Sequence, residues 1–81
     1  NTAKIEDLRK SIALNQKFLF MNDLFSGEKS AYDEAIDKLN SLHTMDEAKS
    51  YLASEVEKQH NWEHNSPAVE QFKILLERKF L

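Results

Sequence analysis

Residues 11–27, SIALNQKFLFMNDLFSG, decide the fold, because residues 18–25 within them hold three phenylalanines, two leucines and one methionine. The stretch ends at Gly27, the only glycine of the chain. Such side chains are buried in most globular proteins, so the stretch predicts a core helix that a left-handed Gly27 ends. With about 100° of rotation per residue, Leu19 falls opposite the expected buried face. That face comprises Phe18, Phe20, Met21, Leu24 and Phe25.

Length and composition indicate one small helical domain. Eighty-one residues suffice for one core and no second, so we expect residues 1–81 to form a single domain. Hairpins and barrels consume glycine and proline, and this chain has one of each. It has no cysteine, which excludes disulfides and thiolate metal sites. The expected fold class is therefore all-α.

A short opening helix is predicted by Ile5, Leu8 and Ile12, which recur at helical spacing among charged residues. We expect a break or kink near residues 13–15. Asn15 could cap a new helix there or continue the first one, because asparagine satisfies the free N–H groups of a first turn. The sequence leaves open whether the first two helices are continuous.

Three further amphipathic helices are predicted, at about residues 28–42, 45–60 and 67–80. Thr44 and Glu47 have the spacing of a capping box at the start of the second. The third begins with a proline, which favours the first helical position. Together the segments predict a compact, single-core array of about five short amphipathic helices.

Charge is unevenly distributed along the chain. The overall net charge is −3, but both ends are net positive and the middle is net negative. Where the termini meet, a basic patch could form from Lys4, Arg9, Lys10, Lys17, Lys73, Arg78 and Lys79. No apolar run approaches the roughly 20 residues that a membrane span needs, so we expect no membrane insertion. The expected location is cytoplasmic.

Catalytic and metal chemistry have weak signals. His60 and His64 have the i, i+4 spacing of two metal ligands on a helix, but the surrounding asparagines and Trp62 favour a solvated loop. Asp33 and Asp37 lie one turn apart on the polar stripe of a helix, which favours a solvated charged face over an acid–base pair. No nucleophile signature or glycine-rich phosphate loop occurs. We expect no enzymatic activity, no cofactor and no metal.

Three residues are candidates for protein contacts: Leu19, Ile74 and Trp62. Leu19 and Ile74 are large apolar residues that lie off the buried faces of their helices. Leu19 could instead be covered by the opening helix, and Ile74 could be an isolated exposed residue of the kind that globular proteins tolerate. Trp62 either plugs the end of the helical array with its N–H bonded, the reading we favour, or anchors an interface.

The chain resembles an uncharacterised all-helical module that recurs at the C-terminus of bacterial proteins. The likeness covers roughly residues 8–80. It is most specific at Phe18-Leu19-Phe20, Asp23-Leu24-Phe25, Tyr32, Leu39-Asn40, Trp62 and Lys79-Phe80. Members often carry glycine where this chain has Ala13 and Ser26. The resemblance implies a helical fold, a bacterial source and a C-terminal position in a longer protein, and it supplies no activity.

Two function classes remain. The favoured one is a non-enzymatic module for interaction with another protein or for self-association. The alternative is a nucleic-acid-associated domain that uses the basic patch. The helix at 28–42, which would have to enter a DNA groove, carries Glu28, Asp33, Glu34 and Asp37, and phosphates would repel these carboxylates.

Overall fold

The chain folds as helical rods joined by short links. A computed structural model describes residues 4–63 and 65–81, and none of these residues forms a β-strand. Since α4, η1 and α5 follow one another without a break, the described residues form five rods, and the predicted all-α fold is confirmed. The elements are α1 (Leu8–Ser11), α2 (Leu14–Leu24), α3 (Lys29–Ser41), α4 (Met45–Tyr51), the π-helical η1 (Leu52–Glu57), α5 (Lys58–His60) and α6 (Pro67–Lys79).

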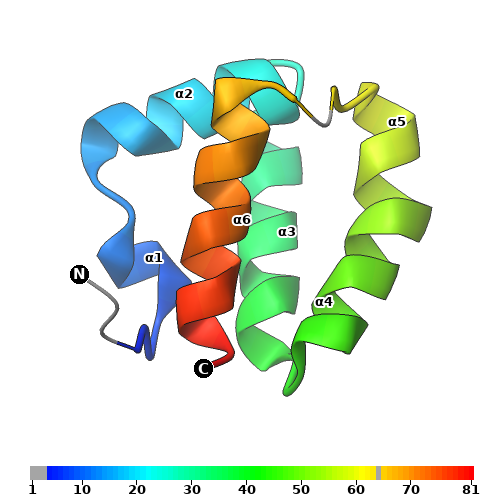
Figure 1. Cartoon of the computed structure of the whole chain (residues 1–81). Helices are drawn as coiled ribbons and strands as arrows, with labels where there is room; N and C mark the ends of the chain where they lie inside the picture. Colours follow the sequence, from blue (N-terminus) through cyan, green and yellow to red (C-terminus); the bar gives the residue numbers. More distant parts are fainter. Residues whose placement is uncertain (1–3, 64) are drawn as a thin grey trace.

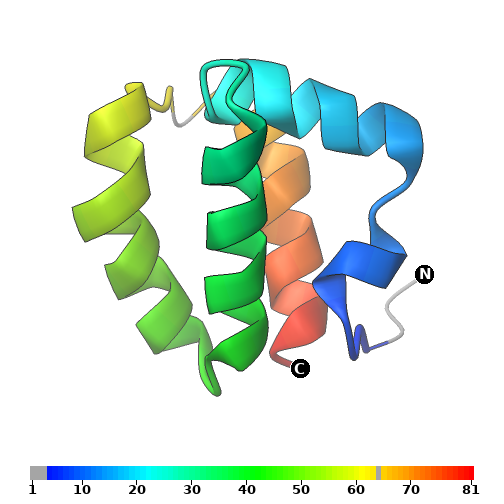
Figure 2. The same cartoon turned by 180° about the vertical axis from the view of Figure 1, so that it is seen from behind.

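Three rods lie alongside one another and a fourth lies across one end (Figure 1). These three are α3, α6 and the continuous α4–η1–α5 rod, and α2 crosses the end at which α6 begins. The α4–η1–α5 rod and α6 run in opposite directions. The view from behind shows the same order, with α1 at the far edge from α4 (Figure 2). This arrangement encloses one core.

The break between the first two helices lies where it was expected. Ile12 and Ala13 are both extended, with ψ angles of 116° and 159°. The capping role that the sequence left open for Asn15 is not observed, because α2 begins at Leu14 with Ala13 as its N-cap, and Asn15 is the second residue of the helix. The amide of Ala13 instead donates to Oε1 of Gln16 at 3.2 Å, so a side chain inside the helix ties down its first turn.

The helix boundaries predicted at Gly27 and at Thr44 are confirmed. Gly27 has a φ of 77° and donates its amide to the Met21 carbonyl at 2.9 Å. Asn61 has a φ of 53° and ends α5. The Thr44 hydroxyl accepts from the Glu47 amide, and Glu47 accepts in return from the Thr44 amide, both at 3.2 Å. The links are therefore fixed by local chemistry.

α2 buries a narrower face than predicted. Phe20, Met21 and Leu24 are buried, but Phe18 is 51% exposed, so its predicted burial is wrong. Phe18 lies about 200° around the helix from Phe20, on the far side from the core. Leu19 is only about 100° from Phe20 and packs, partly buried, against the core. The two residues thus exchange the roles expected of them.

One turn of the α4–η1–α5 rod is a π-helix. The six residues of η1 join α4 to α5, and its side chains Leu52 and Val56 are buried in the core. The periodicity of the sequence predicts only a continuous helix here. π-Helical turns are rare inside α-helices and are frequent at functional sites.

Candidate functional site

An apolar groove runs between the α4–η1 wall and α6. Its volume is about 420 Å³. Four apolar residues line it, Met45, Leu52, Ala53 and Leu76, together with four charged ones, Lys49, Glu57, Lys73 and Glu77. A concave, mainly apolar surface with a few charged groups has the character of a binding site.

The floor of the groove is continuous with the core. Leu52 and Leu76 are buried at 2% and 1% exposure and belong to the core cluster. Met45 is partly buried and packs against that cluster. Ala53 is exposed, and its single methyl group leaves open the space that a longer side chain would fill. The floor is therefore rigid, because it is formed by packed core residues.

The π-helical turn forms part of the groove wall. Leu52, Ala53 and Glu57 all belong to η1 and line the groove. The wider turn changes the angles at which these side chains leave the rod, relative to an α-helix of the same sequence. The groove therefore depends on a local feature that helical periodicity does not reveal.

The charged side chains of the groove are largely free of ion pairs. Within the described part of the chain, Lys49, Lys73 and Glu77 form none. Both walls carry one lysine and one glutamate, so the set is charge-balanced. Lys49, Lys73 and Glu77 are therefore available to a partner.

Two further pockets are less apolar or smaller. The first, of about 330 Å³, lies between the end of α2 and the start of α6 and is lined mainly by polar side chains such as Asn22, Asp23 and Glu63. The second, of about 150 Å³, lies beside Tyr51. Burial, followed by the nearby carboxylates of Glu34 and Glu55, raises the pKa of Tyr51. Neither offers an apolar floor comparable to that of the groove.

The three predicted contact residues differ in how far they are exposed. Ile74 is 55% exposed on the outer side of α6, as its position off the buried face predicts. Leu19 is partly covered by the core. Trp62 is buried at 8% exposure, and its indole Nε1 donates to the Leu24 carbonyl at 2.6 Å. The plugging role of Trp62 is therefore confirmed, and of the three only Ile74 lies exposed.

The basic residues near the N-terminus are engaged in holding the fold together. Lys4 Nζ donates to the carbonyl oxygens of Lys79 at 3.0 Å and of Leu81 at 3.3 Å, where α6 ends. The amide of Ile5 donates to the carbonyl of Arg78 at 3.0 Å. The chain before α1 thus caps the C-terminal end of α6 and brings Lys4 beside Arg78 and Lys79.

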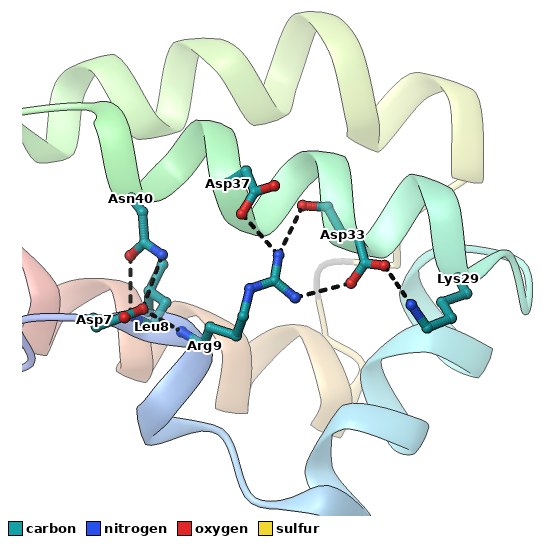
Figure 3. A network of polar contacts seen from close by, with 7 residues as sticks. All are labelled: Asp7, Leu8, Arg9, Lys29, Asp33, Asp37 and Asn40. Atoms are coloured by element: carbon teal, nitrogen blue, oxygen red, sulfur yellow. Dashed lines mark hydrogen bonds and ion pairs between the residues drawn. The ribbon is translucent and has the colours of Figure 1, made fainter.

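Arg9 is bound by carboxylates of α3 (Figure 3). Its guanidinium contacts Asp33 Oδ1 at 3.0 Å and Asp37 Oδ1 at 2.8 Å, and Lys29 contacts Asp33 at 2.7 Å. The hydrogen bonds that the guanidinium donates to Asp37 and Asp33 raise the pKa of Arg9. Asp33 and Asp37 lie on a solvent-exposed charged face of α3, as the sequence predicts, and together they also anchor α1 to α3 through Arg9.

Asn40 completes this junction. Its Oδ1 accepts from the amide of Leu8 at 3.0 Å, and its Nδ2 donates to Asp7 Oδ1 at 3.0 Å. Asp7 Oδ1 also accepts from the amide of Arg9 at 3.0 Å, so Asp7 caps α1. The Asn40 side chain of α3 thereby accepts from the first backbone amide of α1 and donates to the carboxylate that caps this helix.

The residues of the predicted basic patch have different surroundings in the structure. Arg9 is held on α3, and Lys73 lines the groove between α6 and α4. Lys10 is exposed on α1 and Lys17 is half-buried on α2. Lys4, Arg78 and Lys79 lie together at the end of α6.

The histidine pair cannot be judged as a pair, because His64 lies outside the described residues. His60 Nδ1 lies 3.0 Å from the hydroxyl of Ser26. Among the residues that the structure describes, no group of three or more His, Cys, Asp or Glu side chains could hold a metal ion. None of the described helices has the length and hydropathy needed to cross a bilayer.

Comparison with known proteins identifies the family of this chain but assigns it no activity. Residues 9–81 match the family model described as Domain of unknown function (DUF8457). The chain belongs to this family. No curated protein and no solved structure matches it. The DUF8457 match begins at Arg9, so the buried side chains of Ile5 and Leu8 precede the matched region but complete the core.

Proposed function

We propose that this member of the DUF8457 family is a non-enzymatic protein-interaction module and that the α4–α6 groove is its docking surface. The apolar floor of Met45, Leu52, Ala53 and Leu76 carries the proposal. An amphipathic helix is the partner element that such a groove suits, because its apolar face can lie on the floor while its polar face stays in water. The π-helical wall supports the proposal independently.

Nucleic-acid binding is the second candidate. It is supported by the grouping of Lys4, Arg78 and Lys79 at the end of α6. It is weakened because Arg9 is neutralised by two carboxylates, and because phosphate contacts need free cations. A fluorescence anisotropy titration with duplex DNA at low salt tests it. Micromolar binding that weakens steeply with salt would favour this candidate over the groove.

The groove is tested by a titration of the labelled domain with a model peptide. The peptide is an amphipathic helix with leucines at positions i, i+3, i+4 and i+7, and amide resonances are followed by NMR. We expect shifts concentrated in residues 45–57 and 73–77. The variant Ala53→Trp fills the groove from an exposed position and should abolish these shifts while the fold is kept. Shifts elsewhere, or undiminished binding by this variant, contradict the proposal.

The natural setting of the module stays a prediction. From the resemblance we infer a bacterial source and a C-terminal position in a longer protein. A cytoplasmic location is proposed with them.

A further inference from the structure

The outward face of α2 is partly apolar and carries no charge. Among the described residues, four large apolar side chains are exposed, and two of them, Leu14 at 67% and Phe18 at 51%, lie one turn apart on this helix. At about 100° per residue, the outward face spans an arc of roughly 100°. The exposed residues of this arc, which we call the α2 stripe, are Leu14, Asn15, Phe18 and Asn22.

The absence of charge distinguishes the α2 stripe from the other exposed helix faces. Lys17 and Asp23, the charged residues of α2, lie outside the arc, one on each side of it. The exposed faces of α3 and α6 instead carry charged residues, such as Asp37 and Lys38 on α3 and Glu70 on α6. The centre of a protein interface is depleted in charge and enriched in aromatic side chains. The α2 stripe therefore has the character of an interface.

The α2 stripe fits the α4–α6 groove in shape. α2 is a convex rod of 11 residues, about 16 Å long, and it lies across one end of the molecule (Figure 1). The groove wall from Met45 to Glu57 has a similar length of roughly 18 Å. Recognition of a helix by a groove commonly places an apolar stripe of the helix on an apolar floor. The chain thus carries both halves of such a contact.

The two surfaces also agree in charge. A charged side chain laid on the apolar floor would lose its water without gaining a hydrogen-bond partner there. The α2 stripe places only Leu14, Phe18 and two uncharged asparagines on that floor. The charged flanks of α2 then face the rim of the groove, where Lys49, Lys73 and Glu77 form no ion pair within the described part of the chain.

An α2 stripe reaches this groove only from another molecule. Phe20, Met21 and Leu24 hold the opposite face of α2 in the core, so the helix cannot turn its stripe toward the groove of its own chain. We propose that the occupant of the groove is α2 of a second copy, with Leu14 and Phe18 on the apolar floor; this inference rests on the proposed function of the groove. Because two different surfaces meet, the contact is heterologous and leaves a stripe and a groove free to bind further copies.

The contact is tested by sedimentation velocity over a dilution series, with two variants measured alone and mixed. Phe18→Lys places a charge in the α2 stripe and Ala53→Trp fills the groove, so each variant lacks one of the two surfaces. Each variant alone should associate more weakly than the wild type by about tenfold or more. An equimolar mixture should recover dimers, because Ala53→Trp keeps its stripe and Phe18→Lys keeps its groove. Larger species should not return, since neither copy in that dimer has a second working surface.

Two further variants are the matched controls. Ile74→Lys places the same charge at an apolar side chain of similar exposure, 55%, that does not line the groove. Lys58→Trp places the same ring at an exposed position of the rod that carries Ala53, outside the groove lining. Both controls should associate like the wild type. All four changes are at exposed positions, so the circular dichroism spectra should stay that of the wild type.

The second copy is contradicted by a wild type that stays monomeric at every concentration, or by a mixture that forms no dimer. Association that Phe18→Lys weakens and Ala53→Trp leaves unchanged also overturns the inference, because the α2 stripes then bind each other and not the groove. The model peptide separates these results from the proposed function. If no second copy binds the groove but the peptide still does, the proposed function stands and only the occupant is wrong. If neither binds the groove, both are wrong.

Discussion

The indole Nε1 of Trp62 donates a 2.6 Å hydrogen bond to the backbone oxygen of Leu24, at the end of α2. That carbonyl is one of the groups that a helix end leaves without an internal partner. The ring also packs edge-on against Phe25 and Phe72, with centroids 6.1 and 5.8 Å away. Trp62 thereby fixes the link between α5 and α6 to the end of α2.

The Trp62 bond predicts the effect of two substitutions. Trp62→Phe keeps an aromatic ring but leaves a buried carbonyl without its donor, so it should lower the free energy of unfolding by about 1–3 kcal/mol. Trp62→Ala also removes the ring and should cost about 3–5 kcal/mol. Urea denaturation followed by circular dichroism measures both. A Trp62→Phe variant as stable as the wild type contradicts the structural role of this bond.

The segment before the DUF8457 match should be essential for stability. Leu8 is fully buried, whereas Leu14 is 67% exposed in the next helix. Leu8→Ala should therefore cost about 2–5 kcal/mol, and Leu14→Ala, its matched control, should stay within about 0.5 kcal/mol of the wild type. Thermal or urea unfolding of both variants tests the pair. Equal losses for the two leucines mean that the N-terminal segment is not part of the core.

Local sequence signals predicted most of the fold. Gly27, Thr44 with Glu47, and Pro67 mark helix boundaries through chemistry that acts within a few residues, and all three are confirmed. The amphipathic helix predicted at about residues 28–42 is also confirmed, as α3, with Tyr32 and Ile36 buried. Helix boundaries and strongly periodic faces are thus readable without knowledge of the tertiary arrangement.

Features that depend on tertiary contacts could not be predicted from the sequence. Arg9 pairs with carboxylates 24 and 28 residues away, and no local pattern indicates which cation an exposed aspartate will meet. Phe18 and Leu19 are adjacent in a stretch that is apolar on nearly all sides, so periodicity could not decide which one faces the core. The groove depends on a π-helical turn and on how α4 packs beside α6, and no residue pattern in the sequence indicates either feature. Lys73 was noted only for its charge.

The pairing of Asp33 predicts a pH dependence. Hydrogen bonds from Lys29 and then Arg9 lower the pKa of Asp33 below its ordinary value of 3.8. A carboxyl with a lowered pKa in the folded state adds stability above its ordinary pKa, and this contribution is lost as the pH falls through the folded value. The stability difference between the wild type and Asp33→Asn should therefore be largest near neutral pH and shrink below about pH 3.8.

Urea unfolding of Asp33→Asn at a series of pH values measures this difference. Asp23→Asn is the control, because Asp23 forms no ion pair within the described part of the chain. If the Asp33→Asn difference is the same at neutral and acid pH, the ion pairs with Lys29 and Arg9 do not stabilise the fold.

Ser26 offers a test of backbone strain. It has a φ of 57°, a left-handed conformation that costs residues with a Cβ atom about 1–2 kcal/mol, and it is a position at which the similar module often carries glycine. Ser26→Gly and Ser26→Ala both remove the contact with His60, so they differ only in the Cβ atom. Ser26→Gly should be more stable than Ser26→Ala by about 0.5–1 kcal/mol. The reverse order in thermal melts contradicts the left-handed turn.

The central claim, that the groove between α4 and α6 is the docking surface, is tested most directly by methyl NMR of the two methionines. Met45 lines the groove, and Met21 is buried in α2 outside it, so one labelled sample carries both the probe and its control. During titration with the amphipathic helical peptide, the Met45 methyl resonance should shift progressively while that of Met21 stays fixed. A fixed Met45 resonance at saturating peptide, or a shift of Met21 alone, contradicts the claim.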